Sequence, residues 1–268
     1  TGKALDMMEA APVRGYRRKI SGVSSLTDIK DADLIIVTAG QVREPGMKRE
    51  DLFSNNKPVI ESIARDLGSV DASVLIVSEP VDLLTSVFAK ESPIPSERIL
   101  GLGGLLDSTR LRYFISRELG VAMENVSAMV IGRHASSMLP LLRYSCVSGV
   151  PVTRLLPEET IKALEEETRS AGDLIVKMAQ RASAYYAPSA AAADIADALV
   201  NNNRHIVPVS TIFTGQYGIE GVAMSMPCIL GSGGVEKVLE PKLTDQEKEH
   251  LKQSAAEMSK IIASGSKE

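Results

Sequence analysis

The chain has 268 residues, of which 44% are hydrophobic and 24% are charged, and its formal net charge is −4. The acidic balance and an aromatic content of only 4% argue against a nucleic-acid-binding surface or a polybasic membrane patch. No apolar run is long enough to cross a bilayer. Cys146 and Cys228 lack metal-ligand or disulfide spacing, so we expect buried, reduced thiols, which favours a cytoplasmic protein with no metal site.

Strands and helices alternate along the first half of the chain. Apolar runs predict strands at residues 33–39, 73–78 and 99–100. Apolar residues at helical spacing predict helices at residues 49–67, 81–89 and 105–119. The first two runs do not alternate with polar residues, so we expect those strands to be buried on both faces. The alternation predicts an α/β fold with a parallel sheet and right-handed crossovers.

From about residue 127 the chain changes to shorter segments punctuated by Gly and Pro. The predicted elements are a strand at 126–131, a broken helix at 158–187, a helix at 190–199 and a strand-rich region at 206–230. Thr244 is followed three residues later by Glu247, the spacing of a capping box that begins a helix. This second half therefore has the character of an α+β domain.

Three polar residues could form an acid–base site. His134 follows the strand predicted at 126–131, and an imidazole can move a proton near neutral pH. Asp107, 27 residues earlier, could orient that imidazole, and Arg110 shares a helix face with Asp107 and could hold a carboxylate. Each also has an ordinary interpretation, as a solvated loop histidine, a first-turn helix acid and a surface ion pair.

A loop at residues 40–49 follows the first predicted strand, at the edge of the sheet where α/β proteins bind ligands. It contains Gly, Pro and two arginines, Arg43 and Arg49. Such a loop could close over an anion and exclude water. A solvated connection between two elements explains the same residues equally well.

Seven motifs along the whole chain resemble one family in their order and spacing. They are TAG at 38–40, REPGMKREDL at 43–52, EPVD at 79–82, GGLLDSTRLRYF at 103–114, GRHASSMLP at 132–140, SAYYAP at 183–188 and QYGIEGV at 216–222. Together they closely resemble the lactate/malate dehydrogenase family, and within it the malate dehydrogenases of the lactate dehydrogenase-like type.

The resemblance implies a role for each of the charged residues. His134 would exchange the proton of the substrate hydroxyl, Asp107 would orient it, and Arg110 would bind the carboxylate beside the reacting carbon. Arg49 would polarise the carbonyl, and Arg43 would bind a second carboxylate, which favours malate and oxaloacetate. The residues implied in binding NAD, with NADP left open, are Thr38, Ala39, Gly40, Asn56 and Glu79. The family also implies a homodimer or homotetramer.

The family's first strand, its GxGxxG turn and the acidic residue for the adenosine ribose would all precede Thr1. We therefore expect residues 1–126 to be a partial, Rossmann-type dinucleotide-binding domain that lacks its first βα unit. Residues 127–268 would form the substrate domain. Cofactor binding by such a truncated chain alone would be impaired, because those glycines let the backbone approach the pyrophosphate.

Two departures lie inside the implied site. Glu79 stands where the resemblance implies asparagine, and Ala135-Ser136 replace a Gly-Asp pair after His134. We hypothesise that Arg133 pairs with Glu79, because the two charges are opposite and map to one pocket. These departures leave two functions open. The chain is either an NAD-dependent malate dehydrogenase or a catalytically silent relative that serves as a binding or assembly subunit.

Overall fold

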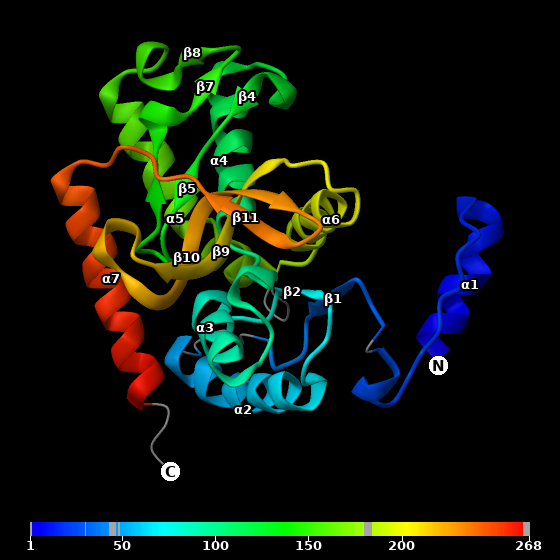
Figure 1. The fold of residues 1–268 in the computed structure, drawn as a ribbon. Helices are drawn as coiled ribbons and strands as arrows, with labels where there is room; N and C mark the ends of the chain where they lie inside the picture. Colours follow the sequence, from blue (N-terminus) through cyan, green and yellow to red (C-terminus); the bar gives the residue numbers. More distant parts are fainter. Residues whose placement is uncertain (1, 30, 43–46, 48, 180–183, 265–268) are drawn as a thin grey trace.

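The computed structural model describes residues 2–29, 31–42, 47, 49–179 and 184–264, and it is built around a mixed six-stranded sheet (Figure 1). Its strands, in spatial order, are β1 (Leu34–Val37), β2 (Ser73–Ile76), β3 (Ile99–Gly101), β9 (Ile206–Thr214), β10 (Glu220–Gly231) and β11 (Gly234–Val238). The first three are parallel, and the others join antiparallel. The predicted α/β fold is therefore confirmed, as a parallel sheet extended by a C-terminal antiparallel part.

The burial of β1 differs from the sequence-based expectation. Every residue of β2 is buried, as its unbroken apolar run predicts. In β1 the buried and accessible positions alternate, and Ile36 is 43% exposed. The prediction of burial on both faces is therefore wrong for β1. This strand is the outer member of the described sheet, and one of its faces borders an open cavity.

Seven α-helices are present in the described part of the chain. They are α1 (Gly2–Arg14), α2 (Arg49–Leu67), α3 (Val81–Glu91), α4 (Gly104–Leu119), α5 (Glu158–Ala179), α6 (Tyr186–Val200) and α7 (Asp245–Ser264). The residues 49–67 predicted to be helical coincide with α2, and α2 and α3 pack together below the sheet in Figure 1. The first helix, α1, has no buried residue and stands apart from the body of the molecule (Figure 1).

The strand predicted at residues 126–131 is divided in two. Its first part, β4 (Val126–Ser127), belongs to a three-stranded sheet with β7 (Cys146–Val147) and β8 (Val150–Pro151). Its second part, β5 (Val130–Ile131), pairs with β6 (Leu139–Pro140). The largely apolar segment 126–131 thus contributes one strand to each of two sheets. After β5 the chain turns at Gly132, which bridges to Ser225 of β10.

The helices of the second half end and begin close to the predicted positions. The break expected within residues 158–187 lies between the end of α5 and the start of α6, and α6 begins four residues before the predicted 190. The capping box is confirmed, because Thr244 N–H donates to Glu247 Oε2 at 2.8 Å and Glu247 N–H donates to Thr244 Oγ1 at 3.2 Å. Cys228 is buried as expected, whereas Cys146 is half-buried, and both thiols are free.

A common hydrophobic core joins the two halves of the chain. It runs from Ile35 and Val37 of β1 through β2, β3, β9 and β10 to Met258 of α7. A smaller core lies between α4, α5 and the β4–β7–β8 sheet. Within the described ranges, no helix is both long and apolar enough to traverse a bilayer.

Candidate active site

The candidate site lies where β1 and β2 end, facing α4 and the segment after β5. The carboxyl ends of parallel strands are the usual place for ligand binding in open α/β sheets. A cavity of about 590 Å³ opens there, a size that suits a small organic ligand. Thr38, Glu79, Arg110 and His134 are among the residues that line it.

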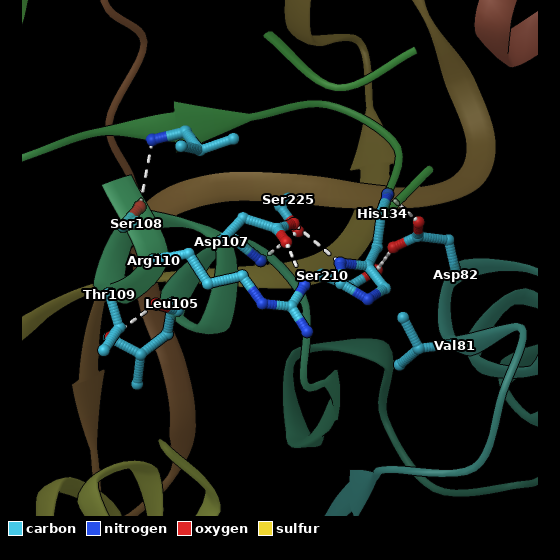
Figure 2. A network of polar contacts seen from close by, with 12 residues as sticks. Val81, Asp82, Leu105, Asp107, Ser108, Thr109, Arg110, His134, Ser210 and Ser225 are labelled. Carbon is cyan, nitrogen blue, oxygen red and sulfur yellow. Dashed lines mark hydrogen bonds and ion pairs between the residues drawn. The ribbon is translucent and has the colours of Figure 1, made fainter. Parts of the chain in front are cut away.

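His134, Asp107 and Arg110 form one connected polar group (Figure 2). His134 Nδ1 lies 2.6 Å from Asp107 Oδ2, and Arg110 Nη1 donates to Asp107 Oδ1 at 3.2 Å. The Asp107 side chain is 2% exposed and that of Arg110 is 11% exposed. The pair is therefore not a solvated surface ion pair. A buried carboxylate that faces two cations is compensated on both of its oxygens.

Asp82, which was not among the residues predicted for the site, binds the backbone N–H of His134. Its Oδ2 accepts a hydrogen bond from His134 N at 2.5 Å, and its Oδ1 accepts one from Ser210 Oγ at 2.6 Å (Figure 2). Burial raises the pKa of Asp82 to about 6, although the hydrogen bond from Ser210 and the charge of His134 act in the opposite direction. Its position in the motif EPVD, beside Glu79, is the only signal that the sequence offered.

Two serines connect α4 to the strands on either side of His134. Ser108 Oγ accepts from Val130 N at 2.9 Å, and Ser225 Oγ accepts from Gly104 N at 2.8 Å. A side chain at Gly104 would meet Val130 O at 2.7 Å, so only glycine permits this close approach of helix and strand. These contacts hold Asp107, in the first turn of α4, opposite the loop that carries His134.

Glu79 contacts the second ring nitrogen of His134. Glu79 Oε1 lies 3.2 Å from His134 Nε2, so each nitrogen of the imidazole faces a carboxylate. Burial of the ring opposes protonation, but the charges of Asp107 and Glu79 outweigh it and raise the pKa of His134 well above its ordinary value of 6.5. The two carboxylates therefore favour the protonated form of the histidine in this arrangement.

The hypothesis that Arg133 pairs with Glu79 is wrong. Arg133 Nη1 instead lies 3.0 Å from Glu257 Oε2 on α7. A second contact from α7 lies nearby, because His250 Nε2 is 2.7 Å from Ser137 O. Arg133 is directed toward this helix, whereas Glu79 faces the cavity. The loop that contains His134 is thus attached to α7 by these two contacts.

The residues implied in cofactor binding divide into two groups. Thr38, Ala39, Gly40 and Glu79 line the cavity. Asn56 is fully buried and is not among the lining residues. Its amide nitrogen donates to Gln41 O at 3.0 Å and to Glu79 O at 2.7 Å, and its oxygen accepts from Gln41 N at 2.7 Å. Asn56 therefore positions two lining segments without itself contacting the space between them.

Two charged residues of α5, Arg169 and Asp173, also line the cavity and were not expected. Arg169 Nε donates to Met138 O at 3.3 Å, and its Nη1 lies 3.5 Å from Glu165 Oε2. Arg110 Nε is buried and finds no hydrogen-bond partner within the described part of the chain. A buried guanidinium N–H without a partner beside a cavity suits a ligand anion.

Two family models cover the chain. The model for the lactate/malate dehydrogenase NAD binding domain matches residues 1–101, and that for the lactate/malate dehydrogenase alpha/beta C-terminal domain matches residues 105–268. The chain belongs to the lactate/malate dehydrogenase family. The first of these models ends at residue 101 and the second begins at residue 105. The domain boundary that the sequence predicts between residues 126 and 127 stays a prediction.

Its relatives in the family include malate dehydrogenases. A malate dehydrogenase of Bacillus subtilis is 38% identical over 263 residues, which is 97% of this chain and 84% of the relative. The apo malate dehydrogenase of Picrophilus torridus has a TM-score of 0.92 and 37% identity, covering 98% of this chain and 85% of its own. A lactate dehydrogenase of Cryptosporidium parvum, solved with lactic acid and nicotinamide adenine dinucleotide, has a TM-score of 0.94 and 33% identity, covering 100% and 87%.

The remaining two family arginines are not placed by the structure. Arg43 lies outside the described residues, and so does the side chain of Arg49, whose backbone begins α2. The structure thus brings together His134, Asp107, Arg110 and the cavity-lining residues of the β1 and β2 ends. The parts assigned to Arg43 and Arg49 stay predictions.

Proposed function

We propose that this member of the lactate/malate dehydrogenase family is an NAD-dependent malate dehydrogenase, which interconverts malate and oxaloacetate. The observation that carries the proposal is the shared cavity, because His134 and Arg110 both line it and Asp107 contacts both. A titratable imidazole and a guanidinium thereby border one ligand-sized space, which supports these two roles. The malate dehydrogenases among the relatives support the same activity.

The cavity also fits a nicotinamide cofactor. Thr38, Ala39 and Gly40, which follow the end of β1, line it, and its volume of about 590 Å³ lies within the range of pockets that hold organic ligands and cofactors. NAD, when bound, supplies the acceptor or donor of the hydride. The family's NAD binding domain model, which covers residues 1–101, favours NAD, and NADP stays open.

His134 would perform the proton transfer. During reduction of oxaloacetate the imidazolium gives its Nε2 proton to the forming hydroxyl oxygen, and during oxidation of malate the neutral imidazole takes it back. Asp107 keeps the ring oriented through Nδ1 and stabilises its positive charge, since it lies 2.6 Å away. Arg110 would bind the carboxylate next to the reacting carbon through its free Nε and the remaining guanidinium donors.

A dicarboxylate substrate requires another cation, and we assign that part to Arg43, with Arg49 polarising the carbonyl. A second carboxylate in a site that excludes water is stable only beside a positive group. Replacing Arg43 with glutamine should shift the preference toward lactate and pyruvate. The measure is the ratio of kcat/KM for malate to that for lactate, and an unchanged ratio would contradict the assignment.

The direct test of the activity is loss of NADH absorbance on addition of oxaloacetate. We expect turnover by the native chain and loss of turnover in His134→Ala. Ser264 is the last residue of α7, so Ser264→Ala serves as a surface control. Turnover that persists unchanged in His134→Ala would refute the role of this residue.

The alternative, a catalytically silent relative, is favoured by one observation, the contact between Glu79 and the His134 nitrogen that would face the substrate. A silent subunit would bind NADH or partner copies without oxidising NADH. Fluorescence titration with NADH, combined with the absorbance assay, separates the two. The family resemblance also favours a homodimer or homotetramer, which sedimentation equilibrium would measure.

A further inference from the structure

The carboxylate of Glu79 is held in a defined place beside His134. Glu79 follows the end of β2, and its Oε2 accepts a hydrogen bond from Val81 N in the first turn of α3 at 3.2 Å. Its other oxygen, Oε1, lies 3.2 Å from His134 Nε2. A backbone N–H at a helix N-terminus favours a carboxylate over a neutral side chain. Glu79 is therefore positioned from one side by a helix and on the other by an imidazole.

The contact uses the one ring atom of His134 that a cavity ligand can reach. Nδ1 is committed to Asp107 at 2.6 Å, and the histidine side chain is only 9% exposed. An oxygen of a ligand that exchanges a proton with this ring must come within hydrogen-bond distance of Nε2. In this structure Glu79 Oε1 is the oxygen found there.

Among the described residues, several elements carry charged side chains near the imidazole. They are Glu79 and Asp82 at the end of β2 and the start of α3, Asp107 and Arg110 on α4, Arg133 beside it in the chain, and Arg169 and Asp173 on α5. Among these, Asp107 and Glu79 contact the ring nitrogens directly. Glu79 is 42% exposed, far more than Asp107 at 2%. Of the two carboxylates, Glu79 is thus the one that can leave.

We propose that Glu79 competes with the ligand for His134 Nε2, so that a 2-oxo or 2-hydroxy carboxylate binds only as the Glu79–His134 contact is broken. The class of the displacing ligand rests on the proposed function. The competition itself does not, because any small anion with an oxygen beside a carboxylate would bridge Arg110 and His134 in the same way. Oxalate, which offers such adjacent oxygens and undergoes no reaction, is a suitable probe.

The pH dependence of binding follows from the same contact. Burial lowers the pKa of His134, and Asp107 and then Glu79 raise it to a position well above 6.5. Removing the Glu79 charge therefore lowers the His134 pKa and narrows the pH range in which the imidazolium can donate to an anion. The same change abolishes repulsion between the carboxylate and the anion. Binding should consequently become tighter in acid and decline earlier as the pH rises.

The test compares the native protein with Glu79→Gln, which keeps the size of the side chain and removes its charge. At about pH 6, where a histidine beside a carboxylate is protonated, calorimetry should find oxalate affinity about tenfold higher in the variant. This gain should shrink toward alkaline pH. An NMR titration of the His134 ring nitrogens should show a lower pKa in the variant.

Glu158→Gln is the matched control, since it removes a carboxylate from an exposed ion pair with Lys162 at the start of α5 and leaves both His134 contacts in place. It should change neither the oxalate affinity nor the His134 titration. Glu79→Asp, which withdraws the carboxylate by one methylene, should give a smaller gain in affinity than Glu79→Gln and provides a second, charge-retaining variant.

Equal oxalate affinity in the native protein and Glu79→Gln at about pH 6 would overturn the proposal, and so would an unaltered His134 titration. Tighter oxalate binding with a lowered His134 pKa supports it, whatever the enzymatic result. If that pattern is found in a protein that does not reduce oxaloacetate, the competition stands and the malate dehydrogenase assignment fails.

Discussion

Asp107 Oδ2 and His134 Nδ1 lie 2.6 Å apart, although the two residues are separated by 27 positions in the chain. Both side chains are at most 9% exposed. The contact sets the orientation of the imidazole and directs Nε2 away from α4, toward Glu79. A buried ion pair of this kind is costly to break from one side, because the remaining charge then has no partner.

Asp107→Asn should lower kcat/KM for oxaloacetate by about 10²–10⁴-fold. The amide has nearly the same shape, but it cannot stabilise the imidazolium and allows the other ring tautomer. Steady-state kinetics at neutral pH measures the loss, and an NMR titration should show a lowered His134 pKa in the same variant. A variant that retains native kcat/KM would show that Asp107 has only a structural part.

Arg110→Lys should weaken substrate binding more than turnover. Lysine keeps the positive charge but loses the planar pair of donors that holds a carboxylate. Loss of a charge-assisted hydrogen bond costs about 1.5–3 kcal/mol, which corresponds to a KM for oxaloacetate raised by about 10- to 100-fold. Thr109, which precedes Arg110 and bonds to Leu105 O within the helix, gives the control Thr109→Ser. A KM equal to the native value would contradict the assignment of Arg110.

The raised pKa of Asp82 should make the free energy of unfolding depend on pH. Its pKa of about 6 in the folded protein lies above its ordinary value of 3.8, so the folded state binds more protons than the unfolded state between these values. The free energy of unfolding should therefore fall as the pH rises through this window, by an amount on the order of 3 kcal/mol. Asp82→Asn, which does not titrate, should lack this decline in urea unfolding measured from pH 4 to pH 7 (roughly the span of the window).

Ser210→Ala tests the same pH dependence of stability through the hydrogen-bond partner of Asp82. The hydrogen bond from Ser210 Oγ to Asp82 Oδ1 lowers the pKa of Asp82, so its removal should extend the decline in stability to higher pH. A decline of equal size in native protein and Asp82→Asn would mean that another group produces it.

Gly40→Ala should destabilise the wall of the cavity. Gly40 has φ +130°, and a Cβ there would lie 2.6 Å from Asn56 Oδ1, an atom already bonded to Gln41 N. We expect the free energy of unfolding to fall by about 1–3 kcal/mol, with weaker NADH binding in fluorescence titration. Gly68→Ala is the control, since Gly68 has φ +60° and no atom within 4 Å of the added carbon. Similar NADH affinities in the two variants would refute a special role for Gly40.

The sequence predicted the elements whose pattern is local. Residues 49–67 have one apolar face and form α2 at the expected positions, and β2, which is apolar after Ser73, is buried on both sides. The pairing of His134 with Asp107 was inferred from motifs whose spacing is fixed by the family. In each case the signal lies in residues that are close in sequence or in motifs that follow the order of the family.

What the sequence did not reveal depends on contacts between distant segments. The segment 126–131 is apolar except for Ser127, yet its two ends pair with different strands, β7 and β6. Arg133 has a carboxylate partner on α7, 124 residues away, which no local pattern identifies. The hydrogen bond from the backbone of His134 to Asp82 is likewise invisible until the start of α3 is placed beside the loop that follows β5.

The joint between β3 and β9 has a consequence for how the protein unfolds. Gly101 pairs with Ser210 across this joint, and apolar residues from both regions matched by the family models fill one core. Separating these two regions would expose the edge of strand β3 and the apolar residues that fill this core to water. The two regions should accordingly melt together in a single transition rather than as independent modules.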